Sequence, residues 1–163
     1  MAATKKRLAA GLTFVEILIA AVVLLIALLG TSTFRYNAAL GVRKAELQTT
    51  AARTALLLCE AWQGLAEPND FEPDADLPEG SGITIVDIGT EAADFSAPDG
   101  FTLHGVYRVT ADDVDYYAVL SWRDIAAGLR ALNVVVAWNQ RGYSDDDGAA
   151  PDKSFALTTY ISN

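Results

Sequence analysis

One carboxylate stands inside the long apolar stretch near the N-terminus of this 163-residue chain. Residues 8–34 contain a single ionisable side chain, Glu16, and residues 17–29 are wholly apolar. At about 1.5 Å per residue, a helix over this stretch reaches roughly 40 Å, against about 30 Å for the hydrocarbon core of a bilayer. A charge inside a spanning helix costs about 2.5–3.5 kcal/mol on insertion scales. We therefore expect Glu16 either to have a partner or to reach the headgroups from near the helix end.

The side chains that carry most enzyme chemistry are scarce and scattered. The chain has one histidine, His104, in a strand-like run, and one cysteine, Cys59, in a helical pattern. Their positions form no Ser-His-Asp or Cys-His arrangement, and a lone cysteine usually behaves as a small apolar side chain. The sequence therefore predicts no enzyme activity, no cofactor and no ordinary structural zinc site.

An acidic run near the C-terminus is the candidate for a cation site. Asp145, Asp146 and Asp147 precede Gly148, with Asp152 nearby, and carboxylate oxygens suit calcium. The run lacks the twelve-residue ligand pattern with a closing glutamate, so a solvated acidic turn is the preferred interpretation. We assign it no metal, and a calcium site in this loop stays open.

The residues around Glu16 resemble the processing motif of type IV prepilins and pseudopilins. The motif is Gly11-Leu12-Thr13-Phe14-Val15-Glu16, after a short basic leader and before the apolar run. In that family a membrane-embedded aspartyl peptidase cuts after the glycine and methylates the new amino terminus. The resemblance implies cleavage after Gly11, methylation of Leu12, and pairing of Glu16 with the terminal amine of a neighbouring subunit. Leu12 and Phe14 differ from the commonest residues at their positions, but both are apolar.

Two other interpretations of the N-terminal stretch exist. A secretory signal peptide would use residues 5–7 as its basic region and a cleavage site near residues 30–32. Its apolar core usually has about 7–15 residues, whereas this one is longer and holds an acid. An uncut anchor that carries a binding domain would keep the leader. The N-terminal residue of the mature protein distinguishes the three.

The helical pattern continues beyond the apolar stretch. Apolar positions recur every three or four residues at Leu47, Ala51, Ala55, Leu58, Trp62 and Leu65. We expect one helix from Leu12 to about Leu65, with this stripe packed on the rest of the protein.

The rest of the chain predicts an antiparallel sheet. Residues 68–100 are rich in proline, glycine and acids and indicate an acidic loop, crossed by one short strand at 83–88. Apolar and polar residues alternate in four later segments, 101–110, 115–123, 129–140 and 155–161. We expect an α+β fold in which the helical stripe covers one face of a four-stranded antiparallel meander. This is the ladle shape of pilins.

Charge limits the partners of the folded part. The formal net charge is −9, which disfavours both nucleic acid and an anionic membrane surface as the main partner of the folded part. The expected organisation is a leader at 1–11, a transmembrane or filament-core helix at 12–34, its amphipathic continuation at 35–66, and an acidic loop with the sheet at 67–163.

The resemblance implies a structural subunit of a filament. Its precursor would wait in the bacterial inner membrane with the N-terminus in the cytoplasm, and then enter a pilus or a periplasmic pseudopilus. The implied partners are prepilin peptidase, other pilin or pseudopilin subunits, the inner-membrane assembly platform and the lipid bilayer. The strand that ends at Trp138 and the closing run Leu157-Thr158-Thr159 resemble PilV-type minor pilins and, less strongly, the I-type minor pseudopilin of type II secretion. The choice between pilus and secretion machine stays open.

Overall fold

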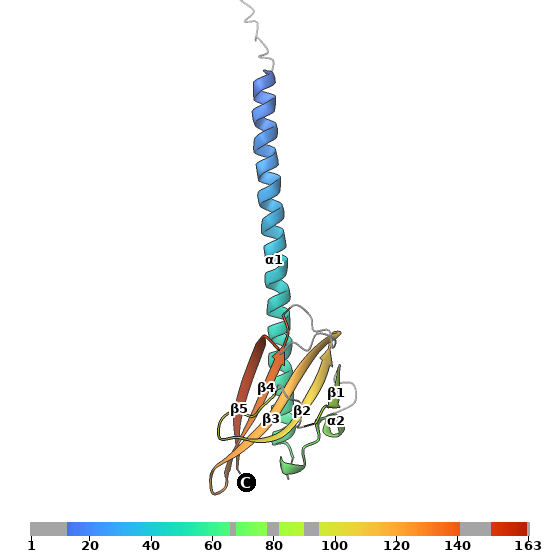
Figure 1. Cartoon of the computed structure of the whole chain (residues 1–163), viewed down its shortest axis with the longest axis vertical. Coiled ribbons are helices and arrows are strands. Elements are labelled where there is room, and N and C mark those ends of the chain that lie inside the picture. Colours follow the sequence, from blue (N-terminus) through green and yellow to red (C-terminus); the bar gives the residue numbers. More distant parts are fainter. Residues whose placement is uncertain (1–12, 66–67, 78–81, 90–94, 141–150, 163) are drawn as a thin grey trace, which may run out of the picture. The chain divides into compact units, whose positions relative to one another are not determined.

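The computed structural model describes residues 13–65, 68–77, 82–89, 95–140 and 151–162. The chain divides into two compact units, Met1–Arg43 and Lys44–Asn163. The long helix α1 contributes residues to both units, and all the strands belong to the second (Figure 1).

Helix α1 runs over Phe14–Gln63 without a break. The chain has no proline before Pro68, so no helix-breaking residue interrupts the hydrogen-bond ladder. The helix ends just before Gly64, within two residues of the predicted end. It is followed by the 3₁₀ turn η1 (Pro68–Asp70) and the short helix α2 (Pro73–Asp76).

Five strands form one antiparallel sheet in the order β1-β2-β3-β4-β5. In Figure 1 they lie side by side in sequence order. Their bounds are β1 (Ile83–Asp87), β2 (Thr102–Ala111), β3 (Val114–Ala126), β4 (Leu129–Trp138) and β5 (Lys153–Ser162). The α+β class is therefore confirmed, but the predicted count of four strands is wrong. The short strand predicted inside the acidic loop pairs with β2, Ile83 opposite Ala111, and forms an edge of the sheet.

The helical stripe predicted from the sequence forms the main core of the second unit. Seven residues of α1 are buried: Leu47, Ala51, Thr54, Ala55, Leu58, Cys59 and Trp62. They pack against alternate residues of the strands, such as Leu120 of β3 and Val134 of β4, which lie opposite each other in the register. Because side chains alternate between faces along a strand, these contacts define one face of the sheet.

Part of the opposite face of the sheet, over β2 to β4, is also buried, which the sequence analysis did not predict. Val106 and Val119 face each other there and are almost fully covered. Residues 95–101, which lead into β2, cross this face (Figure 1). The ring of Phe95 stacks on Tyr117 with 5.0 Å between centroids. The central strands are therefore covered on both sides. The stripe of α1 covers one side, as expected, and the cover on the other side was not predicted.

Candidate functional site

Glu16 lies in the first turn of α1, where its carboxylate caps the helix. The backbone N–H of Thr13 donates to Glu16 Oε2 at 2.8 Å, and the Thr13 hydroxyl donates to the same oxygen at 2.9 Å. In return, the backbone N–H of Glu16 donates to Thr13 Oγ1 at 3.4 Å. This reciprocal pair is a capping box, in which the residue before the helix and the third helical residue satisfy each other's backbone donors.

The capping box gives Glu16 a local role that the sequence analysis missed. Its signal was present as Thr13-x-x-Glu16, the spacing that marks a helix start before an apolar run. A carboxylate in the first turn also interacts favourably with the positive end of the helix dipole. Both contacts use Oε2, and Oε1 accepts no hydrogen bond from any residue that the structure describes. One carboxylate oxygen is thus left for an external donor.

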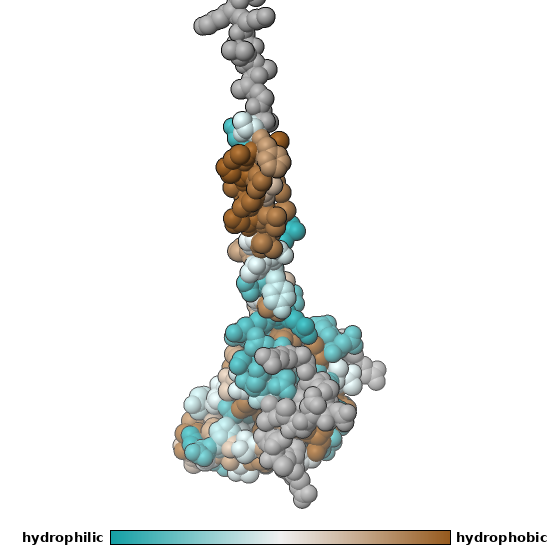
Figure 2. All heavy atoms as spheres, turned by 45° about the horizontal axis from the view of Figure 1, so that its top comes forward, coloured by the Kyte–Doolittle hydropathy of each residue, from teal (hydrophilic) through white to brown (hydrophobic). Residues whose placement is uncertain are grey.

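An apolar surface surrounds the helix beyond this cap. Phe14, Ile17, Leu25 and Leu29 are each more than half exposed in the isolated chain. Figure 2 shows the apolar side chains of this part of α1 as a continuous brown surface on the face in view. From Phe14 to Phe34 the helix rises about 30 Å, which equals the thickness of a bilayer's hydrocarbon core. By length and composition, α1 is able to cross a membrane.

Two of the three hydroxyl groups at the far end of this surface, those of Thr31 and Thr33, are bonded within the helix. Thr31 Oγ1 donates to the carbonyl of Ala27 at 2.8 Å, and Thr33 Oγ1 donates to the carbonyl of Leu29 at 3.1 Å. Threonines that bond back to the preceding turn have a partner within their own helix. The stretch can therefore be buried in an apolar environment up to Phe34 without an unpaired threonine hydroxyl.

The two residues implied for processing, Gly11 and Leu12, lie outside the described residues. So does the acidic run Asp145–Asp147 with Gly148. Asp152 is described, and its carboxylate accepts the backbone N–H of Gln140 at 3.0 Å. Within the described ranges, no group of three or more His, Cys, Asp or Glu side chains is arranged to hold a metal ion.

His104 and Cys59 have structural surroundings. His104 Nε2 lies 2.7 Å from the carbonyl oxygen of Phe71, and its ring is 5.1 Å from that of Trp62. Burial raises the pKa of the Cys59 thiol to about 11, with a further contribution from the charge of Glu60. A thiol with a raised pKa is a poor nucleophile at neutral pH because so little thiolate forms.

A buried arginine forms the most connected polar cluster in the sheet unit. Arg130 on β4 donates from Nε to Asp124 Oδ1 at 2.7 Å and from Nη1 to Asn69 at 2.5 Å. Its guanidinium lies 4.0 Å above the ring of Trp122. These contacts connect the β3–β4 hairpin to the segment after α1. The role of Arg130 is therefore structural.

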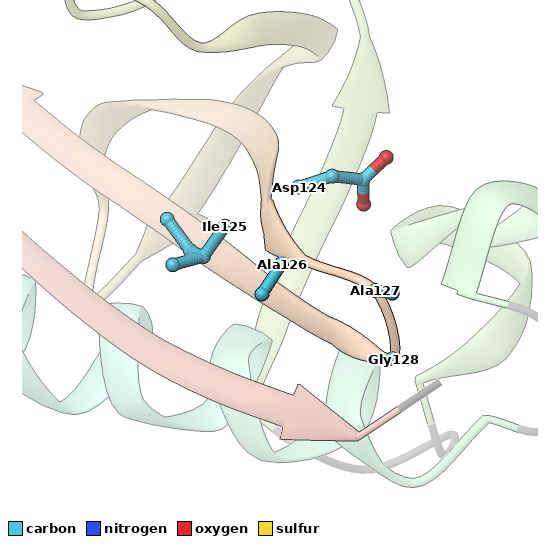
Figure 3. A pocket seen from close by; sticks show the side chains of 5 residues that line it. All are labelled: Asp124, Ile125, Ala126, Ala127 and Gly128. Carbon is cyan, nitrogen blue, oxygen red and sulfur yellow. The ribbon is translucent and has the colours of Figure 1, made fainter.

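The loop of the same hairpin borders a shallow, open pocket of about 300 Å³. It is lined by Asp124, Ile125, Ala126, Ala127 and Gly128 (Figure 3). In Figure 3, the side chains of Asp124 and Ile125 leave the loop on opposite sides. The only charged group at the pocket is therefore the one already paired with Arg130, whereas ligand sites bring several polar groups together.

No protein-family model, characterised protein or solved structure matches this chain. Its function is therefore argued from its own residues. Among the described residues, the capped end of α1 and the apolar surface next to it are the feature that packing within the chain does not explain.

Proposed function

We propose that this chain is a structural subunit of a filament of the type IV pilus class, made as a membrane-bound precursor. The observation that carries the proposal is the placement of Glu16. This acid begins an exposed apolar helix of membrane length, and in the sequence it follows the Gly11-Leu12 pair at the spacing of the prepilin motif.

The proposed mechanism is assembly through α1. In the membrane, the apolar residues between Phe14 and Phe34 face lipid. In the filament, the same surface packs against the helices of other subunits, so the apolar area stays out of water in both states. Glu16 Oε1 would accept the amine of a neighbouring Leu12, while Oε2 keeps the cap with Thr13.

The proposed partners follow from this mechanism. Prepilin peptidase would remove residues 1–11 and methylate Leu12, and an assembly platform in the bacterial inner membrane would add the subunit to others of its class. Within the class we propose a minor pilin, on the strength of the strand ending at Trp138 and the closing strand β5. A minor pseudopilin of type II secretion shares the same processing and the same helix contacts.

The test is the mass of the N-terminal peptide of protein purified from membranes that contain the peptidase. We expect a chain that starts at a methylated Leu12. A chain that keeps Met1, or that starts beyond Gly30, would refute the proposal and favour a membrane anchor or a signal peptide.

Two variants separate the cap of Glu16 from its charge. Glu16→Gln keeps a side-chain oxygen that can accept the Thr13 N–H, whereas Glu16→Ala loses both the cap and the charge. We expect both variants to insert into the membrane, because removing a charge lowers the cost of insertion. Both should be incorporated into filaments less than the wild type, as measured by cross-linking to other subunits. Incorporation of Glu16→Gln at the wild-type level would exclude charge pairing.

A further inference from the structure

A basic segment of α1 directly follows the apolar surface. Arg35, Arg43 and Lys44 are all exposed, and none forms an ion pair with a residue that the structure describes. The sequence has no acidic residue between Glu16 and Glu46. Arg35 therefore has no acidic neighbour on its stretch of helix, and the nearest acid to Arg43 and Lys44 is Glu46, with which neither forms an ion pair.

Aromatic rings flank the first of these cations. Phe34 and Tyr36 are 74% and 66% exposed, and they stand on either side of Arg35 in the sequence. Aromatic residues gather at the boundary between hydrocarbon and headgroups. If the apolar span begins at Phe14, its length of about 30 Å puts Phe34 at this boundary. Arg35 then falls at the level of the headgroups.

The two later cations lie within electrostatic reach of the same layer. Arg43 and Lys44 are eight and nine residues after Arg35 on α1, a rise of about 12–14 Å. Long flexible side chains shorten this separation, and charges act over about 8 Å at physiological salt. Arg35 should therefore contribute most to the attraction to this layer, and Lys44 least.

The rest of the chain has the opposite charge. Residues 54–163 carry 19 acidic and five basic side chains. An anionic bilayer surface would repel this acidic unit, so attraction to the membrane has to come from the basic segment. Each basic residue beside an anionic membrane surface adds about fivefold in affinity.

We propose that Arg35, Arg43 and Lys44 bind the headgroups of anionic phospholipids, with Phe34 and Tyr36 fixing the depth of the helix. This inference rests on the membrane-inserted state of the proposed precursor, and it does not depend on cleavage at Gly11. It gives the precursor a defined lipid partner where it leaves the bilayer. The lipid is recognised by its negative charge beside an apolar phase, which free phosphate in water lacks.

The test is lipid selectivity of the full-length chain with its leader intact. The protein is purified in a non-ionic detergent and supplied with equal amounts of phosphatidylglycerol and phosphatidylcholine, and the bound lipids are counted by native mass spectrometry. We expect at least a tenfold preference for phosphatidylglycerol. The triple variant Arg35→Gln, Arg43→Gln, Lys44→Gln should reduce that preference at least tenfold.

The matched control is Arg53→Gln, which removes an exposed cation of α1 nine residues further along the helix than Lys44. It should change the preference less than twofold. Tryptophan fluorescence verifies that each variant keeps its fold, because Trp62, Trp122 and Trp138 all belong to the sheet unit.

Three outcomes would overturn the inference. In the first, the wild type shows no preference for the anionic lipid. In the second, the triple variant keeps the preference in full. In the third, the triple variant leaves lipid binding unchanged but lowers the mass of a self-associated species. The basic segment would then dock on the acidic unit of a second copy. Processing at Gly11 is measured separately, so failure of the filament proposal and failure of this one are distinguishable.

Discussion

The packing of α1 on the sheet can be measured with two leucines of the same helix. Leu58 is fully buried among strand residues, whereas Leu56, two positions earlier, is half exposed. Replacing Leu58 with alanine removes three carbon atoms from the core. At about 0.8 kcal/mol for each buried carbon, the lost transfer free energy is about 2.4 kcal/mol, and the cavity left behind adds to it. We expect Leu58→Ala to lower the free energy of unfolding by about 3 kcal/mol.

The measurement is urea unfolding of the full chain in a mild detergent, followed by tryptophan fluorescence. All three tryptophans lie in the sheet unit, so the signal reports that unit. With a urea slope of about 1.5 kcal/mol per molar, Leu58→Ala should lower the midpoint by about 2 M. Leu56→Ala, the matched control, should move the midpoint by less than about 0.3 M, the scale of a surface substitution. Equal shifts for the two variants would refute the assignment of the buried stripe.

Two further predictions concern the sheet unit. Asp113, with φ of 59°, occupies the two-residue turn between β2 and β3. Because glycine adopts positive φ at little cost, Asp113→Gly should raise the free energy of unfolding by about 0.5–1 kcal/mol. The measurement is a higher urea midpoint. An unchanged or lower midpoint would show that Asp113 is not strained in this turn. Burial, with a smaller contribution from Asp87, raises the pKa of Tyr107 to about 12 from the usual 10. As the pH rises, the unfolded chain therefore loses this proton before the folded chain does. The free energy of unfolding should fall between about pH 10 and about pH 12. Urea midpoints measured across this range should fall less for Tyr107→Phe than for the wild type.

The long helix and four of the strands were predictable because their patterns are local. The stripe from Leu47 to Trp62 repeats at the helical period, and the alternation in β2 to β5 repeats at two. Each observed boundary lies within about three residues of the predicted one. The turn at Asp112 and Asp113 was also predictable, since aspartate and asparagine tolerate the left-handed conformation better than most residues.

The errors concern pairing and covering, which depend on residues far apart in the sequence. The strand predicted at 83–88 was placed correctly, but nothing in its own residues showed that it joins the sheet through β2. The second covered face had an unused signal. Val134, Val135 and Val136 form an unbroken apolar run, which is typical of a strand buried on both faces. The segment that covers that face, residues 95–101, has no regular period by which it could be recognised.

The candidate site was predicted in part. Glu16 was singled out as an acid that needs a partner, and the structure gives its carboxylate a hydrogen-bond donor in Thr13, which is not the amine that the resemblance implies. The capping role was missed because the motif was interpreted as an assembly signal, although the same spacing serves both. The roles of Gly11, Leu12 and the amine partner of Glu16 stay predictions, because they involve residues outside the described ranges or on another molecule.

The cap at the start of α1 is made from residues only three positions apart, and this has a consequence for a helix that changes surroundings. A helix end whose hydrogen bonds came from water or from a neighbour would fray whenever that neighbour left. Here Thr13 and Glu16 carry their own donors and acceptors. If the helix moves from the membrane into a filament, as the proposed function requires, we expect its first turn to keep these hydrogen bonds, so the move need not include refolding of the helix end.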